Sequence, residues 1–171
     1  MADNPNDIEN DEFKEIRERV TELVLAEGWK IQRAESPDAA WVFMAEDPSG
    51  KMVAFGQNPR FMDFVDLQSN ISLDPAHRQQ FEALPQEEVE QFLWDLRFRL
   101  LSSGVRFAGL QQPFERVALR CRIYRDELES MGGLHRTLEK MSDAMLLVVW
   151  MISKKLGQGA PSDQKMGFGV N

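Results

Sequence analysis

The sequence predicts an α+β domain in which helices flank an antiparallel sheet of five to six strands. Apolar residues recur every three to four positions near both ends and in the middle of the chain, a spacing typical of amphipathic helices. Between these segments lie short runs with the alternation or apolar content of strands. Hairpin-length connections join the strand-like runs, which favours antiparallel pairing over a parallel β-α-β arrangement.

The first predicted element is a helix that begins at Asn10 or Asp11 and ends at Glu27. Its apolar residues recur at helical spacing, and its acidic first turn suits the positive end of the helix dipole. Gly28 is placed to end it. Residues 1–9 are polar, and we expect them to be disordered.

Three to four strands follow this helix, separated by turns that contain proline, aspartate or glycine. The second strand-like run is apolar on both faces, because Trp41 and Phe43 point one way while Val42 and Met44 point the other. A sheet with one face in water carries polar residues at alternate positions, so both faces of this run require a cover. The runs cover residues 29–35, 40–46, 51–57 and 61–73.

Two helices and two further strands complete the middle of the chain. Asp74 is predicted to cap the first of these helices, with Pro75 at its first position, and Gly104 to end the second. The two strands are expected to form a tight hairpin around Gln112-Pro113. The four segments cover residues 75–83, 85–102, 105–111 and 114–125.

The last predicted element is a helical region that Asp126 caps and that reaches about Lys155. Gly132 and Gly133 are the place where an interruption is expected. Residues 157–171 carry Gly, Pro, Ser and Gln, and we expect a flexible tail there. The chain is therefore predicted to hold a single domain over residues 10–156.

Charge and cysteine content narrow the classes of partner and location. The net charge of −8 argues against binding to an extended phosphate backbone, so no nucleic-acid partner is expected. The longest apolar run, residues 144–152, is too short to span a membrane, and the N-terminus has no secretory signal. The single cysteine, Cys121, cannot form an internal disulfide. Together these features predict a cytoplasmic protein without a membrane partner.

Charge is distributed unevenly along the chain. Residues 1–27 hold nine acidic and three basic side chains, whereas residues 97–125 hold seven arginines and one glutamate. The ordinary explanation is that the acidic first helix lies near the basic strands within one molecule.

Four short stretches carry a resemblance to a known family; three lie near junctions between the predicted elements and one lies within the helix predicted over residues 85–102. They are Gly28-Trp29-Lys30, Ile71-Ser72-Leu73 ahead of His77-Arg78, Phe92-Leu93-Trp94-Asp95-Leu96-Arg97, and Ile123-Tyr124-Arg125-Asp126. Through them, about residues 11–155 of the chain resemble the prokaryotic domain-of-unknown-function family 2299. That resemblance implies the type III secretion chaperone-like or YbjN-like fold, an α+β domain that is usually dimeric and holds another protein segment. It implies no catalytic residues and no role in secretion.

The apolar surplus on the central strands has two explanations. Either the C-terminal helix or tail covers the second sheet face, or that face is an interface with a second copy or a client protein. On the second explanation, the candidate interface residues are Trp41, Met44, Phe55 and Trp94.

A second candidate site is an arginine-lined strand face. Arg116, Arg120 and Arg122 project from one face of the last strand, and guanidinium groups bind carboxylates and phosphates bidentately. The alternative is that these arginines form ion pairs within the domain, for example with Glu18 or Glu22.

No catalytic, metal-binding or cofactor-binding residues are predicted. His77 and His135 lack companion ligands at metal spacing, and we expect them at the surface or at helix caps. Cys121 falls on the inward face of a strand and is expected to be buried and inert.

The leading hypothesis is a non-enzymatic, chaperone-like interaction module that acts as a homodimer and binds an unknown protein client. The alternative is a regulator that binds a small anionic ligand or an acidic peptide through the arginine-lined face. An enzyme ranks third.

Overall fold

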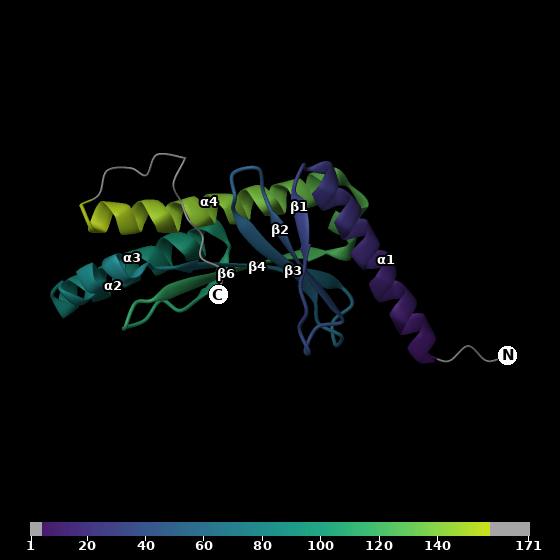
Figure 1. Cartoon of the computed structure of the whole chain (residues 1–171), viewed down its shortest axis with the longest axis horizontal. Helices are drawn as coiled ribbons and strands as arrows, with labels where there is room; N and C mark the ends of the chain where they lie inside the picture. The colour runs from purple at the N-terminus through teal and green to yellow at the C-terminus, as the bar shows by residue number, and fades with distance from the viewer. Residues whose placement is uncertain (1–4, 158–171) are drawn as a thin grey trace. The chain divides into compact units, whose positions relative to one another are not determined.

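The computed structural model describes residues 5–157, and these form the predicted α+β fold (Figure 1). Within the described residues, a six-stranded antiparallel sheet has the strand order β1-β2-β3-β4-β6-β5. Four α-helices and a short 3-10 helix, η1, accompany it in this part of the chain. The elements are α1 (Pro5–Ala26), β1 (Lys30–Arg33), β2 (Trp41–Glu46), β3 (Met52–Gln57), β4 (Phe64–Ser72), α2 (Pro75–Glu82), α3 (Gln86–Ser103), β5 (Arg106–Ala108), β6 (Arg116–Tyr124), η1 (Arg125–Glu129) and α4 (Met131–Lys155).

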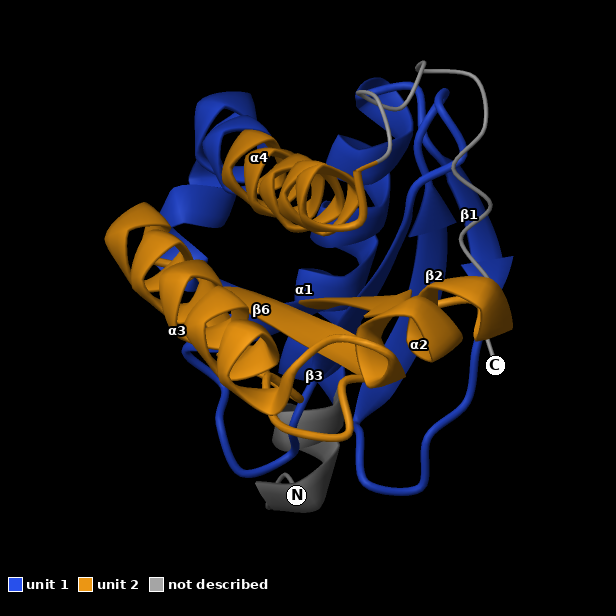
Figure 2. Cartoon of the chain, turned by 90° about the vertical axis from the view of Figure 1, so that its left-hand side faces the viewer, with its two compact units in different colours: residues 1–67, 122–137 blue, residues 68–121, 138–171 orange. Residues whose placement is uncertain are grey.

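Contacts between residues group the chain into two compact units, coloured blue and orange in Figure 2. Unit 1 holds the residues up to 67 together with 122–137, and unit 2 holds 68–121 together with the residues from 138 on. Each unit therefore combines segments that are far apart in the sequence. The single domain expected over residues 10–156 stays a prediction.

Unit 1 is built around the β1-β2-β3 meander, against which α1 lies. The register places Phe43 opposite Phe55 and Ala45 opposite Val53, and all four are buried. The Trp41, Phe43 and Phe55 rings stack in sequence, with centroids 5.7 and 5.2 Å apart. The helix supplies its own apolar stripe to this core, as the periodicity predicts. The stripe consists of Phe13, Ile16, Val20, Leu23 and Val24.

One buried polar side chain fixes the end of this meander. Gln57 is 1% exposed, and its Oε1 accepts a hydrogen bond of 2.9 Å from the Trp41 indole Nε1. Its Nε2 donates to the main-chain carbonyl of Met62 at 3.1 Å. The indole N–H and the amide are thereby satisfied inside the core, as buried polar groups must be.

The junction between β6 and α4 differs from the prediction. Asp126 lies inside η1, and Tyr124 is the N-cap residue, with Glu127 accepting a hydrogen bond from the Tyr124 main-chain N–H at 2.9 Å. The helical region is interrupted at Ser130, whose backbone is extended, and both glycines follow in the first turn of α4. The break therefore comes before the glycines, because the chain must turn from η1 into α4 there.

Unit 2 contains α2, α3, β5, most of β6 and the larger part of α4. Asp74 caps α2 as predicted, since its Oδ1 accepts from the His77 main-chain N–H at 2.8 Å. The helices α3 and α4 run antiparallel. Lys155 at the end of α4 pairs with Glu88 near the start of α3 at 2.7 Å, and Lys140 lies beside Gly104 at the end of α3.

Three boundaries differ from the sequence expectations. The first helix begins at Pro5, so residues 5–9, expected to be disordered, are helical. β5 is only three residues long, because Gly109 adopts a left-handed φ of 83° and turns the chain away. The connection to β6 is therefore longer than the tight hairpin expected. The expected tail falls, apart from Gly157, on residues 158–171, which lie outside the described residues, as do residues 1–4.

Candidate functional site

The four candidate interface residues lie in different environments. Trp41 and Phe55 are 6% and 0% exposed, so their expected place on an accessible surface is corrected. The strand alternation puts both on the sheet face that forms the unit 1 core, where burial of large rings is most favourable. Met44 is half-buried on the opposite face, where the register gives it Gln32 and Ala54 as neighbours.

Trp94 is the fourth candidate, and it is 54% exposed. Phe98 and Leu101, one and two turns further along α3, are 62% and 64% exposed. We call these three residues the α3 stripe. Positions separated by four and three residues lie on one side of a helix, so the stripe is a continuous apolar strip. The opposite side of α3 is buried and consists of Val89, Phe92, Leu93, Leu96 and Leu100.

Arg97 holds part of the stripe in place. Its guanidinium lies 4.8 Å from the centroid of the Trp94 ring and also donates to the main-chain carbonyl of Leu110. The Trp94 and Phe98 rings are 5.9 Å apart. A guanidinium over an indole face is an attractive contact, so Arg97 restrains the exposed ring.

A further exposed tryptophan lies on α4. Trp150 is 56% exposed, and the antiparallel register of the two helices places it level with Trp94. Sequence reasoning missed Phe98, Leu101 and Trp150. For α3 the sequence did contain a signal of this surface. The second half of the helix carries apolar residues around most of its circumference, and a helix of that kind is normally covered on all sides.

The arginine-lined face is partly neutralised by neighbours. Arg122 Nε lies 3.1 Å from Asp66 Oδ1, and its guanidinium stacks 4.0 Å from the centroid of the Phe64 ring. Its ion pair is therefore with Asp66, and the suggested partners Glu18 and Glu22 do not fill that role. Arg120 donates to the Gln68 side chain at 3.1 Å, and Arg116 is exposed on the same face of β6.

Glu12 of the acidic first helix forms a long ion pair with Arg125 at the end of the basic segment. Arg125 Nη1 and Glu12 Oε1 are 3.9 Å apart, and both side chains are about half exposed or close to it, at 52% and 40%. Such a pair contributes little, because solvent screens it. This exposed ion pair is therefore a weak electrostatic contact.

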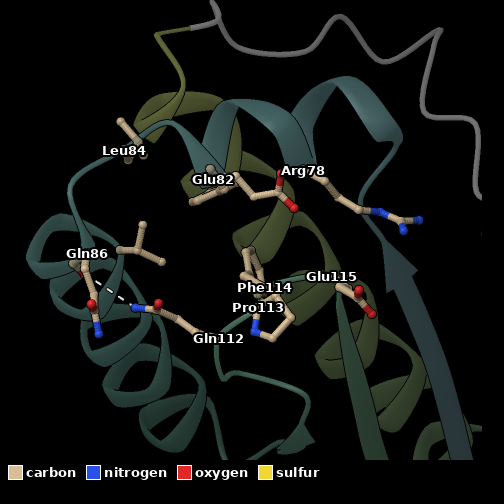
Figure 3. Close-up of a pocket in the computed structure, with 10 residues that line it drawn as sticks. Arg78, Glu82, Leu84, Gln86, Gln112, Pro113, Phe114 and Glu115 are labelled. Carbon is tan, nitrogen blue, oxygen red and sulfur yellow. Dashed lines mark hydrogen bonds between the residues drawn. The ribbon is translucent and has the colours of Figure 1, made fainter.

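Unit 2 also contains a pocket of about 460 Å³ (Figure 3). Its floor is aromatic: the Phe81 and Phe114 rings, which both line the pocket, meet edge to face at 5.1 Å. Its rim is polar, with Gln112 Nε2 donating to the main-chain carbonyl of Gln86 at 3.5 Å. Cavities with an apolar floor and a few polar rim groups are typical of ligand and peptide sites.

The charged rim residues of this pocket are not equivalent. Arg78 Nε donates to the Leu73 carbonyl at 2.9 Å, and Figure 3 shows the guanidinium turned away from the other labelled side chains. In the same view Glu82 of α2 lies above Phe114, and Glu115, immediately before β6, lies to its right. Both residues are exposed. The pocket lining therefore carries two exposed carboxylates, together with one guanidinium that is bound to the Leu73 carbonyl.

The remaining titratable candidates have structural partners. His77 Nδ1 lies 2.9 Å from Asp74 at the α2 cap, and His135 Nδ1 lies 3.1 Å from Glu27. Cys121 is buried as predicted. Burial raises the pKa of its thiol, and the Lys140 ammonium opposes part of that rise.

Neither a metal-binding cluster nor a membrane-spanning helix is present among residues 5–157. No group of three or more His, Cys, Asp or Glu side chains in that range could hold a metal ion. No helix in the same range has the length and apolar content needed to cross a bilayer.

Comparison with known proteins gives a family and a shared fold. Residues 16–152 match the family described as uncharacterized conserved protein (DUF2299). The crystal structure of an uncharacterized protein from Methanothermobacter thermautotrophicus superposes with a TM-score of 0.76 at 24% identity, over 82% of this chain and 99% of that one. No curated protein matches the sequence. Because the family match extends over most of the chain, this protein belongs to the DUF2299 family of uncharacterized conserved proteins.

Proposed function

We propose that this protein is a non-enzymatic, chaperone-like interaction module that forms a homodimer through the α3 stripe. One observation carries the proposal. Three large apolar side chains, each more than half exposed, stand in one strip on a helix whose opposite side is already buried. Soluble proteins seldom leave such a strip uncovered, and a helix of a second copy is its simplest cover.

The area available fits the centre of a dimer interface. An aromatic side chain buries about 150–250 Å² when it is fully covered, so covering the exposed parts of the stripe removes about 300 Å² per chain. A stable interface needs about 800 Å² per partner. The stripe therefore supplies less than half, and surface outside the stripe has to supply the rest.

The client surface is a separate part of the same proposal. On β2 and β3, the sheet face opposite the core carries Val42, Met44, Met52 and Ala54, all half-buried. A flexible methionine pair on a half-covered sheet face suits segments of differing shape. The proposal also includes a cytoplasmic location and a relationship of the fold to the type III secretion chaperone-like or YbjN-like fold.

The regulator hypothesis has less support. A guanidinium that is already paired with Asp66 and stacked on Phe64 must give up both contacts before it grips another anion. Arg116 and Arg120 remain as the accessible part of that face.

A matched pair of leucine substitutions tests the dimer. Leu101→Asp places a charge in the stripe, at a leucine that is 64% exposed. Leu25→Asp places a charge at a leucine on α1 that is 54% exposed. We expect light scattering to show two-chain particles for the wild type and Leu25→Asp, and single chains for Leu101→Asp. A wild type that remains a single chain at every concentration, or two variants that behave alike, would refute the α3 interface.

A further inference from the structure

The pocket of unit 2 lies beside the point where the described chain ends. Lys155 Nζ is 2.7 Å from Glu88 Oε2. Val89, the residue after Glu88 on α3, lines the pocket. Gly157, two residues after Lys155, adopts a left-handed φ of 69°, and α4 does not continue past it. Whatever follows Gly157 therefore starts close to the α3 wall of this pocket.

The segment that follows has a composition that matches the pocket. Residues 158–171 lie outside the described residues, so only their identities enter here. They include Lys165, Met166 and Phe168, with glycines between the last apolar residues. A lysine suits the Glu82 and Glu115 carboxylates, and an aromatic ring or a thioether suits the Phe81 and Phe114 rings.

The length of the segment also suffices. Lys165 is eight residues beyond Gly157, so an extended chain carries it up to about 26 Å, and Phe168 reaches further. Tethering raises the effective concentration of such a segment to the millimolar range, so modest contacts are enough for occupancy.

We propose that the segment from Lys165 to Phe168 occupies this pocket in its own chain. Phe168 packs on the Phe81 and Phe114 rings, and the Lys165 ammonium lies between the Glu82 and Glu115 carboxylates. The pocket is then a peptide site for a cationic residue followed by an apolar one, filled in cis. A segment of the same chemistry from another protein has to displace it. This proposal is independent of the α3 stripe.

Disulfide trapping in the full chain tests this placement. Gln164→Cys is combined with Gln112→Cys at the pocket rim, or with Ser102→Cys as the control. Ser102 lies fourteen residues along α3 from Glu88, about 21 Å, and is therefore also within reach of the segment. Under mild oxidation we expect the Gln112 pair to close within one chain at least about tenfold faster than the Ser102 pair. Phe168→Ala should remove that advantage.

Three results would overturn the proposal. They are equal closure rates for the two pairs, a rate for the Gln112 pair that Phe168→Ala does not change, and disulfides that form only between chains. A second measurement avoids the cysteine variants altogether. The amide resonances of Val89 and Phe114 should shift between the wild-type chain and Phe168→Ala, while those of Val53 in unit 1 should stay unchanged. Unchanged resonances at Val89 and Phe114 would count equally against the segment.

Discussion

Gly133 determines how closely the start of α4 approaches η1. A Cβ at this position would meet the main-chain carbonyl of Glu127 at a separation that real side chains do not show. At the neighbouring Gly132, the nearest atom to an added Cβ is the end of the flexible Arg136 side chain, at 3.5 Å. Two adjacent glycines in the same helical turn therefore have different constraints.

Alanine substitution should separate these two glycines. Gly133→Ala forces η1 and α4 apart, and we expect a loss of about 1–3 kcal/mol in the free energy of unfolding. Gly132→Ala adds a better helix former without a clash, so its effect should be neutral or slightly stabilising. Urea unfolding followed by circular dichroism measures both. Equal effects in the two variants would show that the approach to Glu127 is not a constraint.

At the scale of the element, a buried side-chain hydrogen bond joins β2 to β3, in addition to the main-chain ladder and the stacked rings. The Trp41 indole N–H and the Gln57 amide satisfy each other at 2.9 Å, and the amide also ties the loop that leads toward β4 through the Met62 carbonyl. A buried donor that loses its partner costs more than the bond itself contributes.

A double-mutant cycle measures this coupling. We expect Gln57→Leu to lower the free energy of unfolding by about 1–3 kcal/mol, because it leaves the indole N–H without a partner. In a Trp41→Phe background no indole N–H is present, so Gln57→Leu should cost clearly less. Additive effects in the double variant would mean that the two side chains do not interact energetically.

At the scale of the whole molecule, Cys121 reports on opening of the chain. It is the one cysteine in the sequence, and it is buried in β6. Because burial raises the pKa of the thiol, the reactive thiolate is scarcer at neutral pH than in an exposed cysteine.

A thiol reagent should therefore label the native protein slowly and the urea-unfolded protein fast. With the folded pKa raised, labelling of the native state should increase only at a higher pH than labelling of the unfolded chain. Gly133→Ala should speed native labelling if opening limits the reaction, whereas Gly132→Ala should not. Labelling at the same rate with and without urea would contradict the burial of Cys121.

The order of elements could be predicted from the sequence because each depends on neighbouring residues. Periodicity located α1 and α3, Asp74 marked the start of α2, and alternation located β6. The hairpin-length connections indicated antiparallel pairing. The start of α1 could not be read in this way, because the ends of helices are weakly marked in a sequence. The end of β5 could not be read either, because a sequence does not show that Gly109 takes a left-handed φ.

The candidate surfaces were predicted less well. Trp94 is exposed, and its place in an interface stays a prediction, whereas Trp41 and Phe55 are core residues. An apolar residue looks the same in a sequence whether it lies in a core or on a surface. Only the register of β2 with β3 separates the two for these strands.

The sequence alone therefore determined the fold class, the antiparallel character of the sheet and the burial of Cys121, since local spacing and short connections encode them. Only the tertiary structure decided the strand order, the partner of Arg122, the α3 stripe and the aromatic pocket. Each of these depends on which distant segments come together, and residue spacing carries no record of that.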